Sequence, residues 1–159
     1  MSAFEKALKT FEELVPHGDE SFMVLKAQLL VEHSVGLYVA ARVPSMAKEI
    51  ADRNSPVRSG LALILLAEAV SLRDQVKPAH SDILWPALKV LNSLRNDLAH
   101  SLYPKTGKVV ERMKEFVLIV TGNPIKSSEN LNQLFRTSAM LVVGFLELDR
   151  NPFTPADCE

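Results

Sequence analysis

The sequence predicts an all-α protein, a single-domain antiparallel bundle of about six to seven helices. Apolar residues recur every three to four positions over most of the 159 residues, which is the period of one face of an α-helix. No segment alternates apolar and polar residues as a strand does, and no hairpin dipeptide separates two strand-like runs. The expected connections, about three to seven residues long, favour antiparallel neighbours.

Prolines, glycines and capping residues mark where the expected helices begin and end. Pro44 stops the second helix, Pro56 occupies the first position of another, and Pro86 is tolerated only near a first turn. The expected helices span residues 2–14, 19–42, 45–53, 56–76, 82–102, 108–120 and 128–148. Residues 1–149 then form the bundle domain, and residues 150–159, with two prolines, form a loose tail.

The apolar residues also predict which sides of two helices face the core. In the second helix the predicted core face comprises Phe22, Leu25, Leu29, Gly36, Leu37 and Ala40. His33 falls on this face, so we expect a core histidine with hydrogen-bonded nitrogens. Residues 61–70 are apolar nearly all round, interrupted at Glu68, which is typical of a central helix.

Composition restricts the location and the partners of the chain. Its net charge is −1 and its pI about 6.4, so no general basic field attracts nucleic acid and polyanion binding has to be local. The single cysteine, Cys158, excludes an internal disulfide and suits a reducing compartment. The N-terminus shows no targeting pattern, and no apolar run approaches the roughly 20 residues that span a bilayer. We expect a cytoplasmic protein that does not enter the membrane.

One cation lies among the leucines of the helix expected over residues 82–102. On a helical projection, six leucines form one stripe: Leu84, Leu88, Leu91, Leu94, Leu98 and Leu102. Arg95 falls inside this stripe. A guanidinium stays charged and is costly to bury alone, so Arg95 needs a carboxylate, a dimer partner or a ligand. Asn96 and His100, four residues apart, share the neighbouring flank of the helix.

Two interpretations of this polar group remain open. In the structural one, Arg95 pairs with Glu32 or Glu68, the two candidate buried carboxylates, while Asn96 and His100 tie helix ends together. In the functional one, His100 is a general acid/base and Arg95 stabilises the charge that develops on a phosphate. That pair suits RNA cleavage, in which a 2′-hydroxyl attacks the adjacent phosphate without a metal. Five residues apart on one helix, the two side chains point about 140° from each other, so they converge more easily across a symmetric dimer.

The rest of the sequence offers few sites for other chemistry. It contains no glycine-rich phosphate loop and no nucleophile elbow, and its four histidines lack partners at metal-ligand spacing. We therefore expect no metal site and no cofactor. Lys105, Lys108 and Arg112 form a modest basic cluster after His100. Such runs are usually solvated faces, but this one could steer a phosphate chain.

The segment Leu94-Arg95-Asn96-Asp97-Leu98-Ala99-His100 resembles the signature of the HEPN superfamily, in which a His follows an Arg after four to six residues. A polar residue directly after the Arg, here Asn96, is typical of that signature. The resemblance implies an α-helical bundle that forms a homodimer and brings two motifs into one cleft. It also implies a metal-independent endoribonuclease, often in toxin–antitoxin or phage-defence systems, with RNA and a cognate antitoxin as partners. Arg95 and His100 are then the catalytic pair and Asn96 their polar support. Many proteins with this fold are non-catalytic.

The arrangement of helices also resembles, more loosely, the mannitol operon repressor family, all-α bacterial regulators without a helix-turn-helix. The similarity lies in an apolar helix after Asp19, the helix over residues 56–76 and a later Leu-Arg-x-x-Leu-x-His segment. The leading hypothesis is thus an RNA-directed module that acts as a ribonuclease. The alternative is a non-enzymatic transcription regulator or interaction protein in which the motif is structural. The Arg-to-His spacing favours the first, and the absence of a basic net charge favours the second.

Overall fold

The computed structural model describes residues 3–15, 20–52, 54–58, 60–74, 80–99, 106–125 and 130–150. Within these ranges the protein is all-helical and contains no strand, so the prediction of an all-α helical bundle is confirmed. The elements are α1 (Ala3–Leu14), α2 (Glu20–Arg42), the 3₁₀ turn η1 (Pro44–Met46), α3 (Ala47–Ala51), the 3₁₀ turn η2 (Pro56–Arg58), α4 (Gly60–Arg73), α5 (Ser81–Ala99), α6 (Thr106–Thr121) and α7 (Leu131–Arg150).

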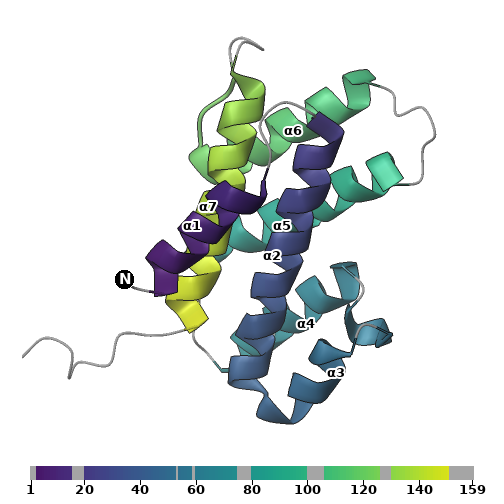
Figure 1. Ribbon diagram of the computed structural model, residues 1–159, viewed down its shortest axis with the longest axis vertical. Helices are drawn as coiled ribbons and strands as arrows, with labels where there is room; N and C mark the ends of the chain where they lie inside the picture. Colours follow the sequence, from purple (N-terminus) through teal and green to yellow (C-terminus); the bar gives the residue numbers. More distant parts are fainter. Residues whose placement is uncertain are drawn as a thin grey trace, which may run out of the picture.

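The long helix α2 lies at the centre of the bundle (Figure 1). It packs against α7, which also contacts α1 and α6, while α5 pairs with α6 and contacts α2. The short helices α3 and α4 cover the second half of α2. Arg42 at the end of α2 donates a 2.9 Å hydrogen bond to the carbonyl of Asp149 at the end of α7. Both helices end at this contact, so α2 and α7 run in the same direction (Figure 1), unlike the antiparallel neighbours that the sequence predicts.

The core lies where α2, α5, α6 and α7 meet. Its largest fully buried side chains include Phe11, Met23, Tyr38, Leu88, Met113, Phe116 and Phe135. The rings of Phe116 and Phe135, 5.1 Å apart, join α6 to α7. The rings of Tyr38 and Trp85, 6.1 Å apart and edge to face, join α2 to α5. Both geometries are favoured by the ring quadrupoles.

The leucine stripe of α5 is confirmed where the structure describes it. Leu84, Leu88, Leu91 and Leu94 are fully buried, Leu98 packs at the edge of the core, and Leu102 lies outside the described residues. Each buried leucine contributes about 1.5–3 kcal/mol relative to an exposed one. Pro86 is the sixth residue of α5, in its second turn rather than its first. The proline removes the hydrogen bond to the carbonyl of residue 82, at a position where both side chains are exposed.

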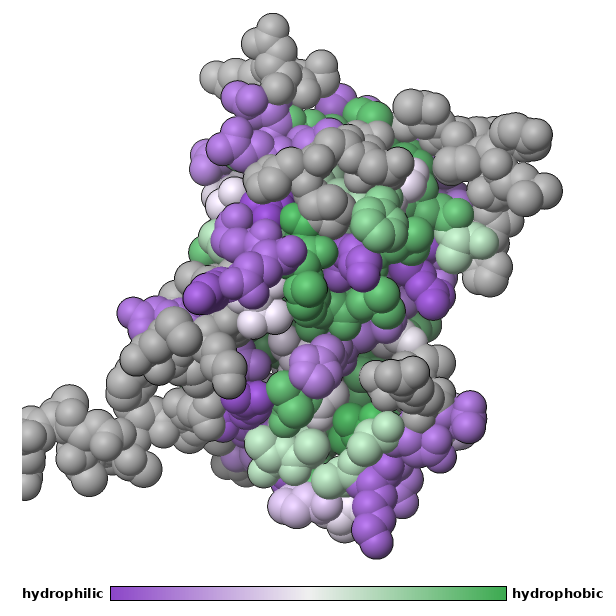
Figure 2. Space-filling model, viewed as in Figure 1, coloured by the Kyte–Doolittle hydropathy of each residue, from purple (hydrophilic) through white to green (hydrophobic). Residues whose placement is uncertain are grey.

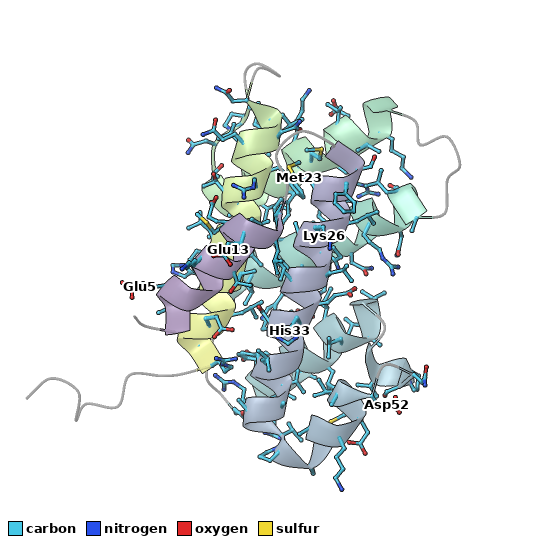
Figure 3. All side chains as sticks on the ribbon, in the orientation of Figure 1. Glu5, Glu13, Met23, Lys26, His33 and Asp52 are labelled. Carbon is cyan, nitrogen blue, oxygen red and sulfur yellow. The ribbon has the colours of Figure 1, made fainter. Side chains whose placement is uncertain are left out.

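The prediction of which side of α2 faces the core is wrong over the first half of the helix. Phe22 is 51% exposed and Leu29 57% exposed, and His33, expected in the core, is also exposed (Figure 3). The side of α2 that enters the core is instead Met23, Val24, Ala27, Val31, Val35, Tyr38 and Val39. Apolar residues line both sides of this helix, so periodicity alone could not choose between them. The unburied side contributes apolar surface to the face shown in Figure 2.

The helix predicted over residues 56–76 is also different in the structure. It is divided into η2 and α4, and α4 lies at the surface rather than at the centre. Leu61 and Leu65 are each 48% exposed and Leu72 is 67% exposed. Only one side of α4 is buried, comprising Leu63, Ile64, Ala67, Val70 and Ser71. An apolar run without a polar face does not by itself show that a helix is enclosed.

One helix in the described ranges, residues Ser21–Arg42 of α2, is long and apolar enough to cross a membrane by length and composition. About half of its most apolar stretch, 56%, is buried inside the bundle. The core helix of a soluble protein satisfies the same criteria, so this is weak support for a membrane span.

Candidate functional site

The candidate site begins with Arg95 and Asn96 near the end of α5. Nη1 of Arg95 donates a 3.0 Å hydrogen bond to Oδ1 of Asn96. Both side chains are half-buried, although Leu91 and Leu94, which precede Arg95 in the stripe, are fully buried. The stripe leaves the core as α5 approaches its end, and a long side chain there can bury its stem and expose its charged head. This neutral amide therefore orients the guanidinium without itself cancelling the charge.

The two carboxylates expected to pair with Arg95 have other partners. Glu68 forms a 2.8 Å ion pair with Lys89, and Oε1 of Glu32 accepts a 3.0 Å hydrogen bond from Gln28. Both glutamates are half-buried rather than buried. Within the described part of the chain, no ion pair involves Arg95. The expected carboxylate pairing of Arg95 is therefore not found among these residues.

Glu32 instead lies where α2, α4 and α5 meet, near Asn92 of α5. A Cβ added to Gly60, the first residue of α4, would lie 2.2 Å from Oδ1 of Asn92 and 2.7 Å from Oε1 of Glu32. Asn92 is 6% exposed and belongs to the same flank of α5 as Asn96, because four residues complete about one turn. Asn92 thus packs against the start of α4, with Glu32 of α2 close by, at a position where only a glycine fits.

An aspartate that the sequence interpretation did not single out connects α5 to α6. Oδ1 of Asp97 lies 2.6 Å from Nζ of Lys108, and Oδ2 lies 3.7 Å from Nε of Arg112. Arg112 also pairs with Glu115 at 3.3 Å. Two of the three predicted phosphate-steering cations are therefore already paired. The sequence signal for this was the i, i+4 spacing of Lys108 and Arg112, which places both on one side of α6.

His100 and Lys105 lie outside the described residues. The pairing of Arg95 with His100 stays a prediction from the sequence, and so does a role for Lys105 in binding phosphate.

A second charged group joins the ends of α2, α4 and α7. Nη1 of Arg42 lies 3.5 Å from Oδ2 of Asp74, and its guanidinium stacks 4.5 Å from the ring centre of Tyr38. Arg73 donates a 2.7 Å hydrogen bond to Asp74, and this bond holds the pKa of the carboxyl below its usual value. Burial raises the pKa of Tyr38. These contacts hold the ends of the helices together, so we infer that they stabilise the fold rather than bind a ligand.

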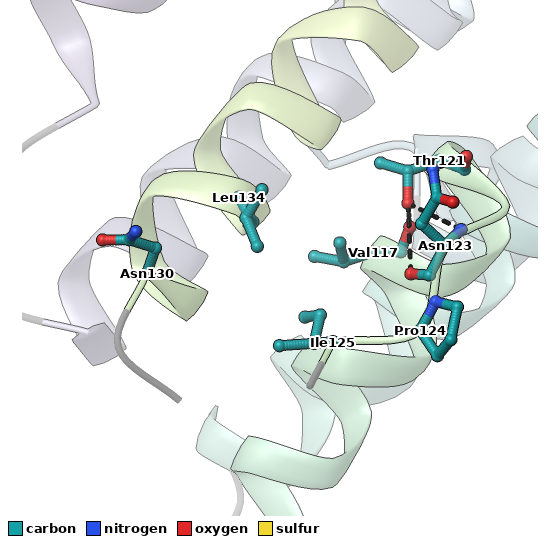
Figure 4. A pocket seen from close by; sticks show the side chains of 7 residues that line it. All are labelled: Val117, Thr121, Asn123, Pro124, Ile125, Asn130 and Leu134. Carbon is teal, nitrogen blue, oxygen red and sulfur yellow. Dashed lines mark hydrogen bonds between the residues drawn. The ribbon is translucent and has the colours of Figure 1, made fainter. Parts of the chain in front are cut away.

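Two pockets lie between helices. One, of about 440 Å³, lies between the end of α6 and the start of α7 and is lined by Val117, Thr121, Asn123, Pro124, Ile125, Asn130 and Leu134 (Figure 4). The polar atoms of Thr121 and Asn123 form hydrogen bonds with the last turn of α6 and with each other. Gly122, between them, has a φ of 70°, as glycines at helix ends often do. The other, of about 580 Å³, lies between α2, α3 and α4.

No group of three or more His, Cys, Asp or Glu residues in the described ranges is arranged to hold a metal ion. No protein-family model, curated protein or solved structure matches this chain.

Proposed function

We propose that this chain is an RNA-directed protein of the HEPN type and that Arg95 and His100 form its catalytic pair for metal-independent RNA cleavage. The observation that carries the proposal is the environment of Arg95. Its guanidinium lies at the edge of the core and donates to the neutral amide of Asn96. A paired arginine would already be neutralised, whereas this one retains its charge for an anionic ligand.

The geometry of Arg95 suits a phosphate. A guanidinium has five N–H donors in a planar fork. Among the described residues one hydrogen bond, to Asn96, uses one of these donors, and the others can bind phosphate oxygens. Asn96 restricts the rotation of the guanidinium, which lowers the entropy lost when it binds. In this role Arg95 stabilises the negative charge that grows on the phosphate during attack.

The proposed reaction needs one proton acceptor and no redox chemistry. His100 takes the proton of the 2′-hydroxyl, and the 2′-oxygen forms a bond to the adjacent phosphorus. The bond from phosphorus to the 5′-oxygen then breaks, and that oxygen takes a proton from water as it leaves, while the protonated His100 returns its proton to solvent. The products are a 2′,3′-cyclic phosphate end and a 5′-hydroxyl end. Since Arg95 and His100 diverge by about 140° on a regular helix, we propose that the active site combines two copies of the chain.

The test is cleavage of a single-stranded RNA in the presence of a metal chelator. The proposal expects cyclic phosphate ends, no cleavage of the matching DNA, and a loss of about 10²-fold or more for His100→Asn, as is typical of general acid–base groups. Arg95→Gln should lose activity, and Arg95→Lys should restore only part of it because an ammonium lacks the planar fork. His33→Asn is the matched control, since His33 is an exposed histidine on another helix.

Two results would overturn this function. One is cleavage that persists unchanged in His100→Asn, which would indicate a contaminating nuclease. The other is a protein that binds and cleaves no RNA and loses only thermal stability in His100→Asn and Arg95→Gln.

The second candidate function is a non-enzymatic regulatory or interaction protein in which the motif is structural. The observation that favours it is the neutralisation of Lys108 and Arg112 by Asp97 and Glu115, in a chain with a net charge of −1. A surface with few unpaired cations attracts RNA weakly. The second of the two overturning results above would favour this candidate.

A further inference from the structure

The residues that line the pocket between α2, α3 and α4 have no role in the proposed RNA cleavage. Its volume of about 580 Å³ falls within the roughly 300–1,000 Å³ typical of small-molecule sites. Gly36 and Ala40 of α2 and Ala47 and Ala51 of α3 line it, and residues this small fill little of the space. Such sites are mostly apolar with a few polar groups that fix the orientation of the ligand.

The charge at this pocket is negative. Glu32 carries the only formal charge among the described residues that line it, and His33 lies beside it. An ionised carboxylate accepts hydrogen bonds and donates none. Gln28 donates to Oε1 of Glu32 at 3.0 Å, which holds the carboxylate in place without cancelling its charge. A ligand with a positive, hydrogen-bond-donating head is therefore complementary, and a ligand with an anionic head is repelled.

One wall of the pocket, the helix α3, has few buried contacts with the rest of the protein. The helix α3 has five residues, none of them fully buried, and extended backbone follows it at Asp52, with φ of −71° and ψ of 117°. One of its contacts with α2 is made by Ile50, whose Cγ2 lies 3.0 Å from the position of a Cβ on Gly36. Segments with few buried contacts open at low free-energy cost. A ligand can therefore enter by a small displacement of α3 and be covered when α3 returns.

We propose that this pocket binds a small primary amine with an apolar body. The ammonium group pairs with Glu32, and the apolar body packs against Ala40, Ala47 and Leu63 under the cover of α3. This site is independent of the proposed RNA cleavage, because it lies between α2 and α3 rather than at the end of α5.

The test compares two probes that differ in head group only. Phenethylamine and 3-phenylpropionate are titrated separately into the ¹⁵N-labelled full chain, and backbone amide shifts are followed by NMR. The proposal expects saturable shifts confined to α2, α3 and the start of α4 with the amine, and no saturable shifts with the acid.

Variants then separate this pocket from general surface binding. Glu32→Gln should weaken amine binding about tenfold, the value of one charge-assisted hydrogen bond, while Glu49→Gln on the exposed side of α3 should not. Ala47→Leu fills the hollow and should abolish binding, and Ala51→Leu is a second filling variant. Ala62→Leu is the matched control, because Ala62 is also an exposed helical alanine but does not line the pocket.

The proposal is overturned if both probes bind equally, if neither binds at millimolar concentration, or if Glu32→Gln binds the amine as tightly as the unaltered chain. Melting temperatures of all variants confirm that each one is folded before it is titrated. None of these measurements involves RNA, so their failure and a failure of the ribonuclease assay are distinguishable.

Discussion

Gly60 and Asn92 are in contact at the point where α4 starts against α5. The position of a Cβ on Gly60 would lie 2.2 Å from Oδ1 of Asn92, closer than any non-bonded pair of such atoms allows. Asn92 is enclosed, with 6% of its surface exposed. Asn92 is also one turn before Asn96, which orients Arg95. The absence of a side chain at Gly60 thus allows the start of α4 to approach the candidate catalytic helix closely.

Gly60→Ala should destabilise the protein by about 1–2 kcal/mol, within the usual range for overpacking. Glu32 can swing toward solvent, but the amide of Asn92 has to rotate in an enclosed space and lose its present contacts. The measurement is urea unfolding followed by circular dichroism. Gly107→Ala is the matched control, because nothing lies within 4 Å of its Cβ position. That change should be neutral or stabilise α6 by up to about 1 kcal/mol.

The same contact can be isolated with a double-mutant cycle. If Asn92 is the obstacle, Gly60→Ala should cost less in an Asn92→Ala background, with a coupling of about 1 kcal/mol. An equal cost in both backgrounds would contradict the assignment and point to Glu32 or to the backbone.

Arg136→Met should destabilise the protein by about 3 kcal/mol, because several hydrogen bonds to a buried charged group are lost together. Arg136 is 7% exposed on α7. It donates to the carbonyl of Val15 at 2.9 and 3.1 Å and to the carbonyl of Glu12 at 3.0 Å, closing the end of α1. Thermal unfolding measures the loss.

The side chain of Glu12 provides the control for Arg136. Its carboxylate lies 2.9 Å from Nη1 of Arg136 but is 53% exposed. Glu12→Gln should therefore cost under about 1 kcal/mol, as exposed ion pairs do. If Glu12→Gln costs as much as Arg136→Met, the ion pair and not the carbonyl cap holds α1 in place.

The helices could be predicted from the sequence because local signals mark them. Pro44 and Pro56 bound the segment that contains α3, and the leucine stripe of α5 has one unambiguous apolar side, which is the buried side. The orientation of α2 could not be predicted, since both of its sides are apolar and the choice depends on which helices pack against it. The valines on one side are buried in the core, whereas Phe22 and Leu29 on the other side are exposed.

The candidate site was predictable only in part. Arg95 in a leucine stripe is a local signal, and the structure places it at the edge of the core beside Asn96. The partners of Glu32 and Glu68 depend on how α2, α4 and α5 pack, and sequence spacing carries no information about that. Lys89, which pairs with Glu68, lies on a different helix.

Asp74→Asn should reduce stability at neutral pH and leave it unchanged at strongly acidic pH. The hydrogen bond from Arg73 lowers the pKa of Asp74 below its ordinary value of 3.8. A lowered pKa means that the folded state binds the proton less tightly than the unfolded state. The stabilisation is therefore complete above the ordinary pKa and is lost as the pH falls through the folded value.

Urea unfolding at several pH values measures this linkage. The difference between the unaltered chain and Asp74→Asn should be constant above about pH 5 and shrink toward pH 2. Glu13→Gln is the control, because its ion pair with Lys9 is long, 3.9 Å, and 63% of the Glu13 side chain is exposed. A difference that does not vary with pH would show that Asp74 acts through its shape rather than its charge.

Asp97→Asn should strengthen RNA binding and steepen its dependence on salt. Asp97 neutralises Lys108 at 2.6 Å and contacts Arg112 at 3.7 Å, so removing its charge frees Lys108 and leaves Arg112 paired with Glu115 alone. Each cation that then contacts a phosphate adds about 0.7 to the slope of log affinity against log salt for a single strand. Fluorescence anisotropy with a labelled RNA measures this slope.

Glu111→Gln removes an equal charge from α6, from an exposed pair with Lys114, and controls for the change in net charge. An equal effect in both variants would mean that Lys108 and Arg112 do not contact the RNA, and the steering role of this basic cluster would then be wrong.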